Sequence, residues 1–134
     1  MGKSFEERRR WFDEHVSRLT CPCCGYPTLD ERGADDICLI CWWEDDGQDD
    51  PDADRVGGPN QGYSLAHARR NLEEHLTMYD RDEAAPFLVE AKKTLIAAFE
   101  GLWRLPDPKQ NASTWKHIRE CERAVFKMRH GTEP

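Results

Sequence analysis

The sequence of 134 residues has no long hydrophobic run. A helix needs about 20 consecutive apolar residues to cross a bilayer, and no stretch of this chain approaches that length. The first residues, MGKSFEERRRWFDEHV, also lack the apolar core of a secretory signal. We therefore expect a cytoplasmic protein with no membrane partner.

Motifs of common catalytic and nucleotide-binding sites are also missing. The sequence contains no Gly-rich phosphate loop and no Ser nucleophile elbow, and its five histidines show neither HxxxH nor HExxH spacing. Basic residues are outnumbered, since 19 Lys and Arg stand against 26 Asp and Glu and the net charge is −7. Binding to a phosphate backbone needs clustered Lys and Arg, so this charge disfavours nucleic acid. It permits a basic protein partner, and it is equally explained by solubility alone.

Cysteine is abundant within one short stretch. Five of the six cysteines lie in CPCCGYPTLDERGADDICLIC, and two Cys-x-x-Cys pairs stand there thirteen residues apart. In a cytosolic protein this spacing is typical of a zinc site, because each tight turn presents two sulfurs to the same ion. The predicted ligands are Cys21, Cys24, Cys38 and Cys41.

The residues around the cysteine pairs fit such turns. Pro22 stiffens the first turn, and Gly25 can adopt the left-handed conformation that follows its second ligand, whereas Trp42 stands at the matching position of the second turn. Four thiolates fill a tetrahedral shell, so we expect one structural zinc ion with Cys23 as a spacer. Iron in place of zinc, and Cys23 as a ligand, are the open alternatives.

Helical periodicity is found on both sides of the cysteines. We expect helices over residues 4–19, 64–79, 83–102 and 114–129, with a capping box at Ser4 and a C-terminal cap at Gly131. The last two apolar stripes are Phe87, Leu88, Ala91, Leu95, Ala98, Phe99 and Leu102, and then Trp115, Ile118, Cys121, Val125 and Met128.

The predicted fold is mostly α, with a small zinc-ribbon or knuckle module packed on a helical bundle. The residues between the cysteine pairs, with Gly33-Ala34 near their middle, are expected to form a short β-hairpin. We predict a single domain over residues 1–134, in which residues 20–62 form the knuckle module and an acidic loop, and residues 63–131 form the helical part.

The loop EDDGQDDPDADRVGGPNQG allows two interpretations. It is not an EF-hand, because Arg55 and Gln61 stand where that motif requires Gly and Glu. In one interpretation its polar residues satisfy turns and helix starts, while the tryptophans pack the module onto the helices. In the other, a partner or ligand surface is formed by Trp42, Trp43, Glu44, Asp45, Asp46, Asn60, Ser64 and Arg69.

Four segments together resemble the bacterial cysteine-rich CPCC family. They are CPCCGY, CLICWWEDDG, DPD and GGPNQGYSLAHARRN, which span about residues 21–71. The resemblance implies zinc binding. Because some members of that family occur near toxin genes, it also implies an immunity or antitoxin role.

Three classes of function follow from these observations. The first is a non-enzymatic zinc-binding protein that acts through protein–protein interaction. The second is a nucleic-acid-binding zinc ribbon, whose basic face would be formed by Arg8, Arg9, Arg10, Arg69 and Arg70. The third is an enzyme that uses the acidic loop with a second metal ion. The sequence does not indicate an oligomeric state.

Overall fold

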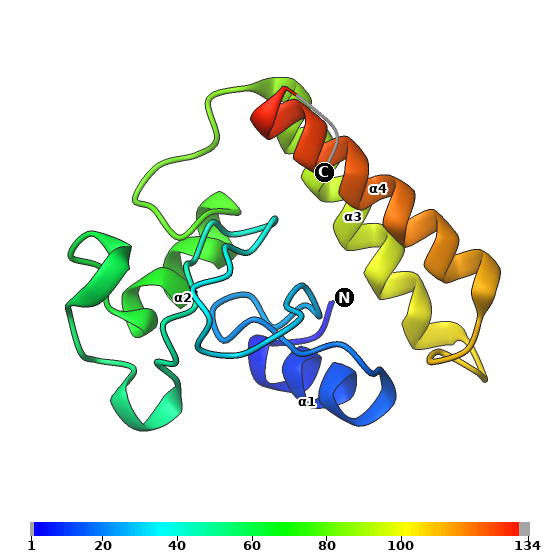
Figure 1. Cartoon of the computed structure of the whole chain (residues 1–134), viewed down its shortest axis with the longest axis horizontal. Coiled ribbons are helices and arrows are strands. Elements are labelled where there is room, and N and C mark those ends of the chain that lie inside the picture. The colour runs from blue at the N-terminus through cyan, green and yellow to red at the C-terminus, as the bar shows by residue number, and fades with distance from the viewer. Residues whose placement is uncertain (1, 132–134) are drawn as a thin grey trace. The chain divides into compact units, whose positions relative to one another are not determined.

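The computed structural model describes residues 2–131, most of whose regular structure is helical (Figure 1). The chain forms two compact units, Met1–Asp82 and Glu83–Pro134. The single domain over residues 1–134 stays a prediction, and the predicted helical part, 63–131, is divided between the units. Within the described residues, no helix is both long enough and apolar enough to cross a membrane.

The first helix, α1 (Phe5–His15), begins at the predicted capping box. Ser4 accepts a hydrogen bond from the Glu7 amide, and the Glu7 side chain accepts one from the Ser4 amide. The helix ends four residues earlier than predicted. Val16 is already extended, and Leu19 pairs with Leu29 in an antiparallel bridge, which requires extended backbone.

The second helix, α2 (Leu65–His75), begins at Ser64 as predicted. The Ser64 hydroxyl accepts a hydrogen bond from the His67 amide. The helix ends before Leu76, which has a left-handed backbone (φ 58°) and donates its amide to the Leu72 carbonyl. The predicted helix to Tyr79 is therefore too long, because a left-handed cap stops it.

The predicted β-hairpin between the cysteine pairs is not confirmed. Residues 2–131 contain three isolated bridges and no strand. The bridge Leu19↔Leu29 flanks the first cysteine pair, and Ile37↔Glu44 flanks the second. The segment between them, DERGADD, is poor in strand-forming residues, and Gly33 and Asp35 both have positive φ. Each cysteine pair thus has its own single bridge instead of one shared hairpin.

The acidic loop is irregular, as predicted, and contains two short 3₁₀ turns. These are η1 (Asp50–Asp52) and η2 (Gly58–Asn60). Much of the apolar core of the first unit comes from α1, the knuckles and α2, and its largest fully buried side chain is Trp43. The loop and the knuckles therefore share one core with two short helices.

The second unit is a helical hairpin. It consists of α3 (Pro86–Gly101), the 3₁₀ turn η3 (Leu102–Arg104) and α4 (Ala112–His130), and its two long helices run side by side in opposite directions (Figure 1). Asn111 caps the start of α4, and Gly131 (φ 74°) ends it as predicted. Cys121 is buried, as predicted for a core thiol.

Two residues of the predicted apolar stripes are exposed instead of buried. Phe87 is 78% exposed and Met128 is 53% exposed, whereas Leu88, Leu95 and Val125 are buried. Each helix of the hairpin packs on its neighbour with one stripe, and residues such as Phe87 lie on a second stripe beside it. The predicted burial is therefore wrong for Phe87 and Met128, whereas most of each stripe is buried as predicted.

Candidate metal centre

The first knuckle is a tight turn around Cys21. The Gly25 amide donates to the Cys21 carbonyl at 2.8 Å, and the Cys23 amide approaches the Cys21 sulfur at 3.4 Å. Gly25 has a φ of +78°, as the sequence predicts, and a side chain there would meet the Phe5 ring at 3.3 Å. Glycine at this position is therefore required by both backbone conformation and space.

The second knuckle repeats this pattern at Cys38. The Trp42 amide donates to the Cys38 carbonyl at 3.0 Å, and the Ile40 amide approaches the Cys38 sulfur at 3.4 Å. Trp42 has a φ of +75°, although it is not glycine. A bulky residue in this conformation is strained, so the surrounding contacts must hold the turn. The two turns are equivalent in backbone even though their sequences differ.

The two knuckles bring four sulfurs together. The sulfur atoms of Cys21, Cys24, Cys38 and Cys41 all lie within 4.8 Å of one another, and all four residues are fully buried. The Cys21–Cys41 and Cys24–Cys38 sulfur pairs are each 3.6 Å apart, and the cysteines are free thiols. A tetrahedron with metal–sulfur bonds of about 2.3 Å has edges of about 3.8 Å. The cluster therefore fits a tetrahedral metal ion.

The electrostatics of the cluster also favour a cation. Burial raises the pKa of the Cys21, Cys24 and Cys41 thiols. Burial alone would also raise the pKa of Cys38, but hydrogen bonds from the other three thiols and from the Thr28 hydroxyl bring it well below its usual value. Four thiolates so deeply buried require a positive charge among them, and a bound dication would supply it.

Cys23 is fully buried but does not belong to this cluster. Among residues 2–131, the four clustered cysteines are the one group of three or more possible ligands close enough to hold an ion. The carboxylates of the acidic loop do not form a second group of this kind in that part of the chain.

Two arginines hold the first knuckle from outside. Arg8 of α1 donates to the Cys24 carbonyl at 2.9 Å and pairs with Glu73 at 3.0 Å, and Arg69 of α2 donates to the Pro22 carbonyl at 2.8 Å. Two backbone carbonyls of the first knuckle thus accept hydrogen bonds from guanidinium groups of the flanking helices. Arg8 is buried and does not belong to an open basic face, and its spacing from the buried Phe12 (i, i+4) was a signal for burial.

Asp45 ties the second half of the module together. Its carboxylate is fully buried and accepts hydrogen bonds from the Arg32 side chain at 2.9 Å and from the Gly33 and Gly47 amides at 2.7 and 3.1 Å. Asp46 accepts one from the Gln48 amide at 3.1 Å. These contacts are those of turn-forming carboxylates, and the role of Arg32 was missed because nothing in its local sequence marks it.

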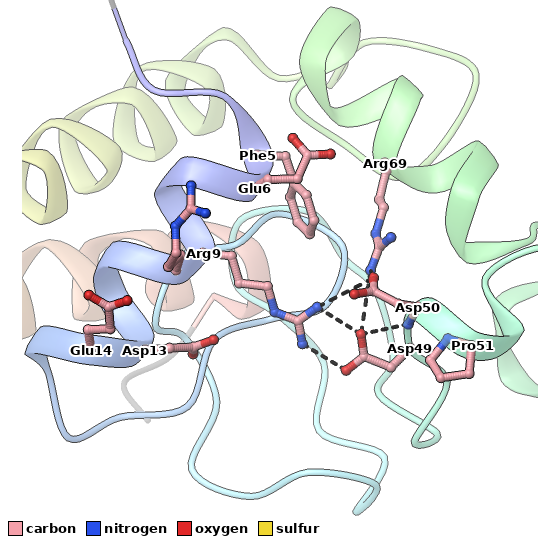
Figure 2. Close-up of a pocket in the computed structure, with 10 residues that line it drawn as sticks. Phe5, Glu6, Arg9, Asp13, Glu14, Asp49, Asp50, Pro51 and Arg69 are labelled. Atoms are coloured by element: carbon pink, nitrogen blue, oxygen red, sulfur yellow. Dashed lines mark hydrogen bonds and ion pairs between the residues drawn. The ribbon is translucent and has the colours of Figure 1, made fainter.

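Asp49 is surrounded by three arginines that are far apart in sequence. Arg9 contacts both of its oxygens at 2.7 Å, Arg32 lies at 2.9 Å and Arg69 at 3.6 Å. The hydrogen bonds from Arg9, followed by those from Arg32, hold the pKa of Asp49 well below its usual range. Figure 2 shows Arg9 of α1 and Arg69 of α2 both pointing toward Asp49 and Asp50.

This ion-pair cluster forms one side of an open pocket of about 740 Å³. The pocket is also lined by carboxylates of α1, including Glu6, Asp13 and Glu14 (Figure 2). The Arg69 guanidinium lies 4.6 Å from the centre of the Phe5 ring and pairs with Asp50 at 2.8 Å. Because acids outnumber arginines in the lining, the pocket favours a cationic group over an anion.

The remaining residues of the predicted partner surface differ in exposure. Trp43, Asp45 and Asn60 are at most 3% exposed, so they support the fold. Asn60 exchanges two hydrogen bonds of 2.9 Å with the Glu44 backbone, and Ser64 caps α2. The residues that keep some exposure are Trp42, Glu44, Asp46, Ser64 and Arg69.

Comparison with known proteins agrees with the cysteine pattern. Residues 19–86 match the family model described as Cysteine-rich CPCC. No curated protein and no solved structure matches the chain.

Proposed function

Because the chain belongs to the cysteine-rich CPCC family, we propose that it holds one structural zinc ion and acts without catalysis, by binding a protein with a basic surface. The observation that carries this proposal is the closed shell of four buried, converging sulfurs. A zinc ion with four protein ligands has no open position for water or substrate, so its role is structural.

Zinc is favoured among the ions that tetrahedral thiolate sites accept. It binds four thiolates without geometric strain, whereas iron in such a site mainly serves electron transfer. The six cysteines are free thiols, which suits a reducing compartment, and we propose the cytoplasm on that ground. Metal analysis of the purified protein distinguishes zinc from iron directly.

The charge distribution supports a basic protein partner. The first unit, Met1–Asp82, carries 19 of the 26 acidic residues but only 10 of the 19 Lys and Arg. Five of its arginines form ion pairs within the unit, namely Arg8, Arg9, Arg32, Arg55 and Arg69. The unit is therefore strongly acidic towards solvent, which favours rapid association with a cationic surface. An antitoxin or immunity protein that covers the cationic groove of a nuclease would have this character.

The two alternatives have less support. The nucleic-acid hypothesis needs a free basic face, but Arg8, Arg9 and Arg69 are committed to carbonyls or carboxylates. The enzyme hypothesis needs available carboxylates in the acidic loop, but Asp45 and Asp49 are held by arginines.

The test combines metal analysis with co-purification. We expect one zinc per chain, and a complex with the protein encoded by an adjacent reading frame that dissociates as salt is raised. For the metal analysis alone, Cys121→Ser is the control variant that should keep its zinc, because Cys121 lies outside the sulfur cluster. Two zinc ions per chain, or salt-sensitive binding to DNA or RNA but not to protein, would contradict the proposal.

A further inference from the structure

A groove follows the helical hairpin of the second unit. It has a volume of about 720 Å³ and is lined by residues of α3 and α4 only. Phe87, Ala91 and Thr94 recur along α3 at helical spacing, and Cys121, Ala124 and Met128 recur along α4. The groove is thus the seam between two antiparallel helices, which is the shape that a third helix fills.

The groove has large side chains at one end and small ones beside them. Ala91 and Ala124 lie one helical turn from Phe87 and Met128, where they leave space for a bulky side chain. Phe87 is near the start of α3 and Met128 near the end of the antiparallel α4, so both stand at the same end of the hairpin, and they are 78% and 53% exposed. They are the two large hydrophobic residues exposed in the described part of the second unit, and both line this groove. Exposed apolar residues gathered on one groove are typical of a binding surface.

The charge of the lining identifies the partner's chemistry. Glu90 of α3 and Glu120 of α4 both line the groove, and none of its described lining residues is Lys or Arg. The basic residues of α4, such as Lys116 and Lys127, lie outside that lining. Because the two carboxylates come from different helices, a helix that lies in the seam would have one on either side. Lys or Arg residues on both flanks of that helix's apolar stripe would therefore complement the two carboxylates.

We propose that this groove binds an amphipathic helix of another protein, whose apolar stripe is flanked by lysines or arginines. The proposal rests on the proposed function, because both require a basic protein partner, and it adds the surface and the shape of the recognised segment. The anchors of that helix would be large apolar side chains at i, i+4 and i+7. A second copy of this chain, docked groove to groove, would bring the same carboxylates and no cations.

The experiment uses the full-length, metal-loaded protein and two synthetic helical peptides. Both peptides carry the same leucine stripe, which is flanked by lysines in one and by glutamates in the other. We expect the lysine peptide to bind about tenfold more tightly, or better. Its binding should shift the amide NMR signals of Phe87, Ala91, Ala124 and Met128. A lysine peptide with scrambled leucines controls for attraction to the acidic chain as a whole.

Variants separate the groove from the rest of the surface. Phe87→Ser and Met128→Ser should each weaken binding of the lysine peptide about tenfold, while the zinc content stays unchanged. Val56→Ser is the matched control, because Val56 is 60% exposed and belongs to the first unit. The double change Glu90→Lys and Glu120→Lys should reverse the preference between the two peptides.

Three results would overturn the inference: equal binding of both peptides, signal shifts confined to the first unit, or a dimer of this chain that Phe87→Ser dissociates. These outcomes are distinct from failure of the proposed function. If the chain lacks zinc or binds no basic protein, the proposed function fails, whatever the peptides do. If zinc and a basic partner are found but the peptides do not bind, the groove proposal alone fails.

Discussion

The two units contain very different amounts of regular structure. The first has two helices of 11 residues each, joined by about fifty residues of turns and single bridges, whereas the second has helices of 16 and 19 residues. Long helices satisfy their own backbone hydrogen bonds and bury an apolar stripe against each other. The knuckles and the acidic loop cannot do this. They rely on a sulfur cluster and on arginines that bind carbonyls and carboxylates.

The two units also differ in how buried polar residues stabilise them. In the first unit, Asp45 is fully buried and is held by Arg32 and two backbone amides. In the second, Lys92 is fully buried and pairs with Glu83 at 3.3 Å. The contacts of Asp45 hold loop residues that lack the backbone hydrogen bonds of a helix or sheet. Loss of these contacts should therefore lower the stability of the protein more than changes at the ends of the helices.

The largest effect is expected from Cys24→Ser. The binding free energy of a structural zinc is also folding free energy, at about 10–16 kcal/mol in small domains, so loss of one sulfur should unfold the knuckles. Zinc analysis and circular dichroism would measure this, and part of the helical signal should persist because α3 and α4 contain none of the four clustered cysteines. Cys23→Ser should leave the metal content unchanged. If the two variants behave the other way round, the ligand assignment is wrong.

Asp45→Ala should have the next largest effect. Removing this buried carboxylate leaves two backbone amides without their acceptor and deprives Arg32 of one of its two carboxylate partners. We expect the free energy of unfolding to fall by about 3 kcal/mol. Urea unfolding measures the loss. Asp54→Ala, at an exposed position of the same loop, should change stability by less than about 0.5 kcal/mol. Equal effects of the two substitutions would show that Asp45 does not organise the loop.

Asp49→Asn should remove an acid-sensitive part of the first unit's stability. The pKa of Asp49 is lowered in the folded protein by Arg9 and then Arg32, so its contribution is present above the unfolded pKa of about 4 and is lost as pH falls below it. We expect a loss of about 2 kcal/mol at pH 7, and a smaller difference from wild type at pH 3. Urea midpoints of both proteins at each pH measure this. Thiolate protonation affects both proteins alike, and a difference that does not shrink in acid would contradict the assignment.

The smallest effects are expected at two helix caps, one in each unit. Ser4 caps α1 and Asn111 caps α4, and replacement of either by alanine should cost about 1 kcal/mol. Circular dichroism during urea unfolding measures both. If the chain unfolds in two steps, Ser4→Ala should move one midpoint and Asn111→Ala the other. A single transition that both variants shift equally would support the single domain predicted from the sequence.

Local structure was the part best predicted from the sequence. The capping box at Ser4, the left-handed Gly25 and the Gly131 cap all depend on contacts within a few residues. The same holds for the cysteine spacing, because two residues between paired cysteines leave few ways to present both sulfurs. Helix ends were less accurate where a distant partner decided them, as the Leu19↔Leu29 bridge does for α1.

The residues around the site were harder to predict. Arg9, Arg32 and Arg69 meet at Asp49 from three separate segments, and no local pattern distinguishes them from the solvated arginines beside them. The sequence around Trp43 and Asn60 is equally compatible with an exposed partner surface and with a buried core, and both side chains are buried in the structure. Phe87 and Met128 belong to apolar stripes that predict burial, but both are exposed.

The sequence by itself therefore determined the two knuckles, the helices and their caps, because these follow from backbone preferences and from short spacings along the chain. Only the tertiary structure decided which arginines hold the knuckles and the acidic loop, and which apolar stripe of α3 and α4 stays exposed. Those outcomes depend on contacts between residues that are distant in sequence, and such contacts are set by the packing of the whole unit.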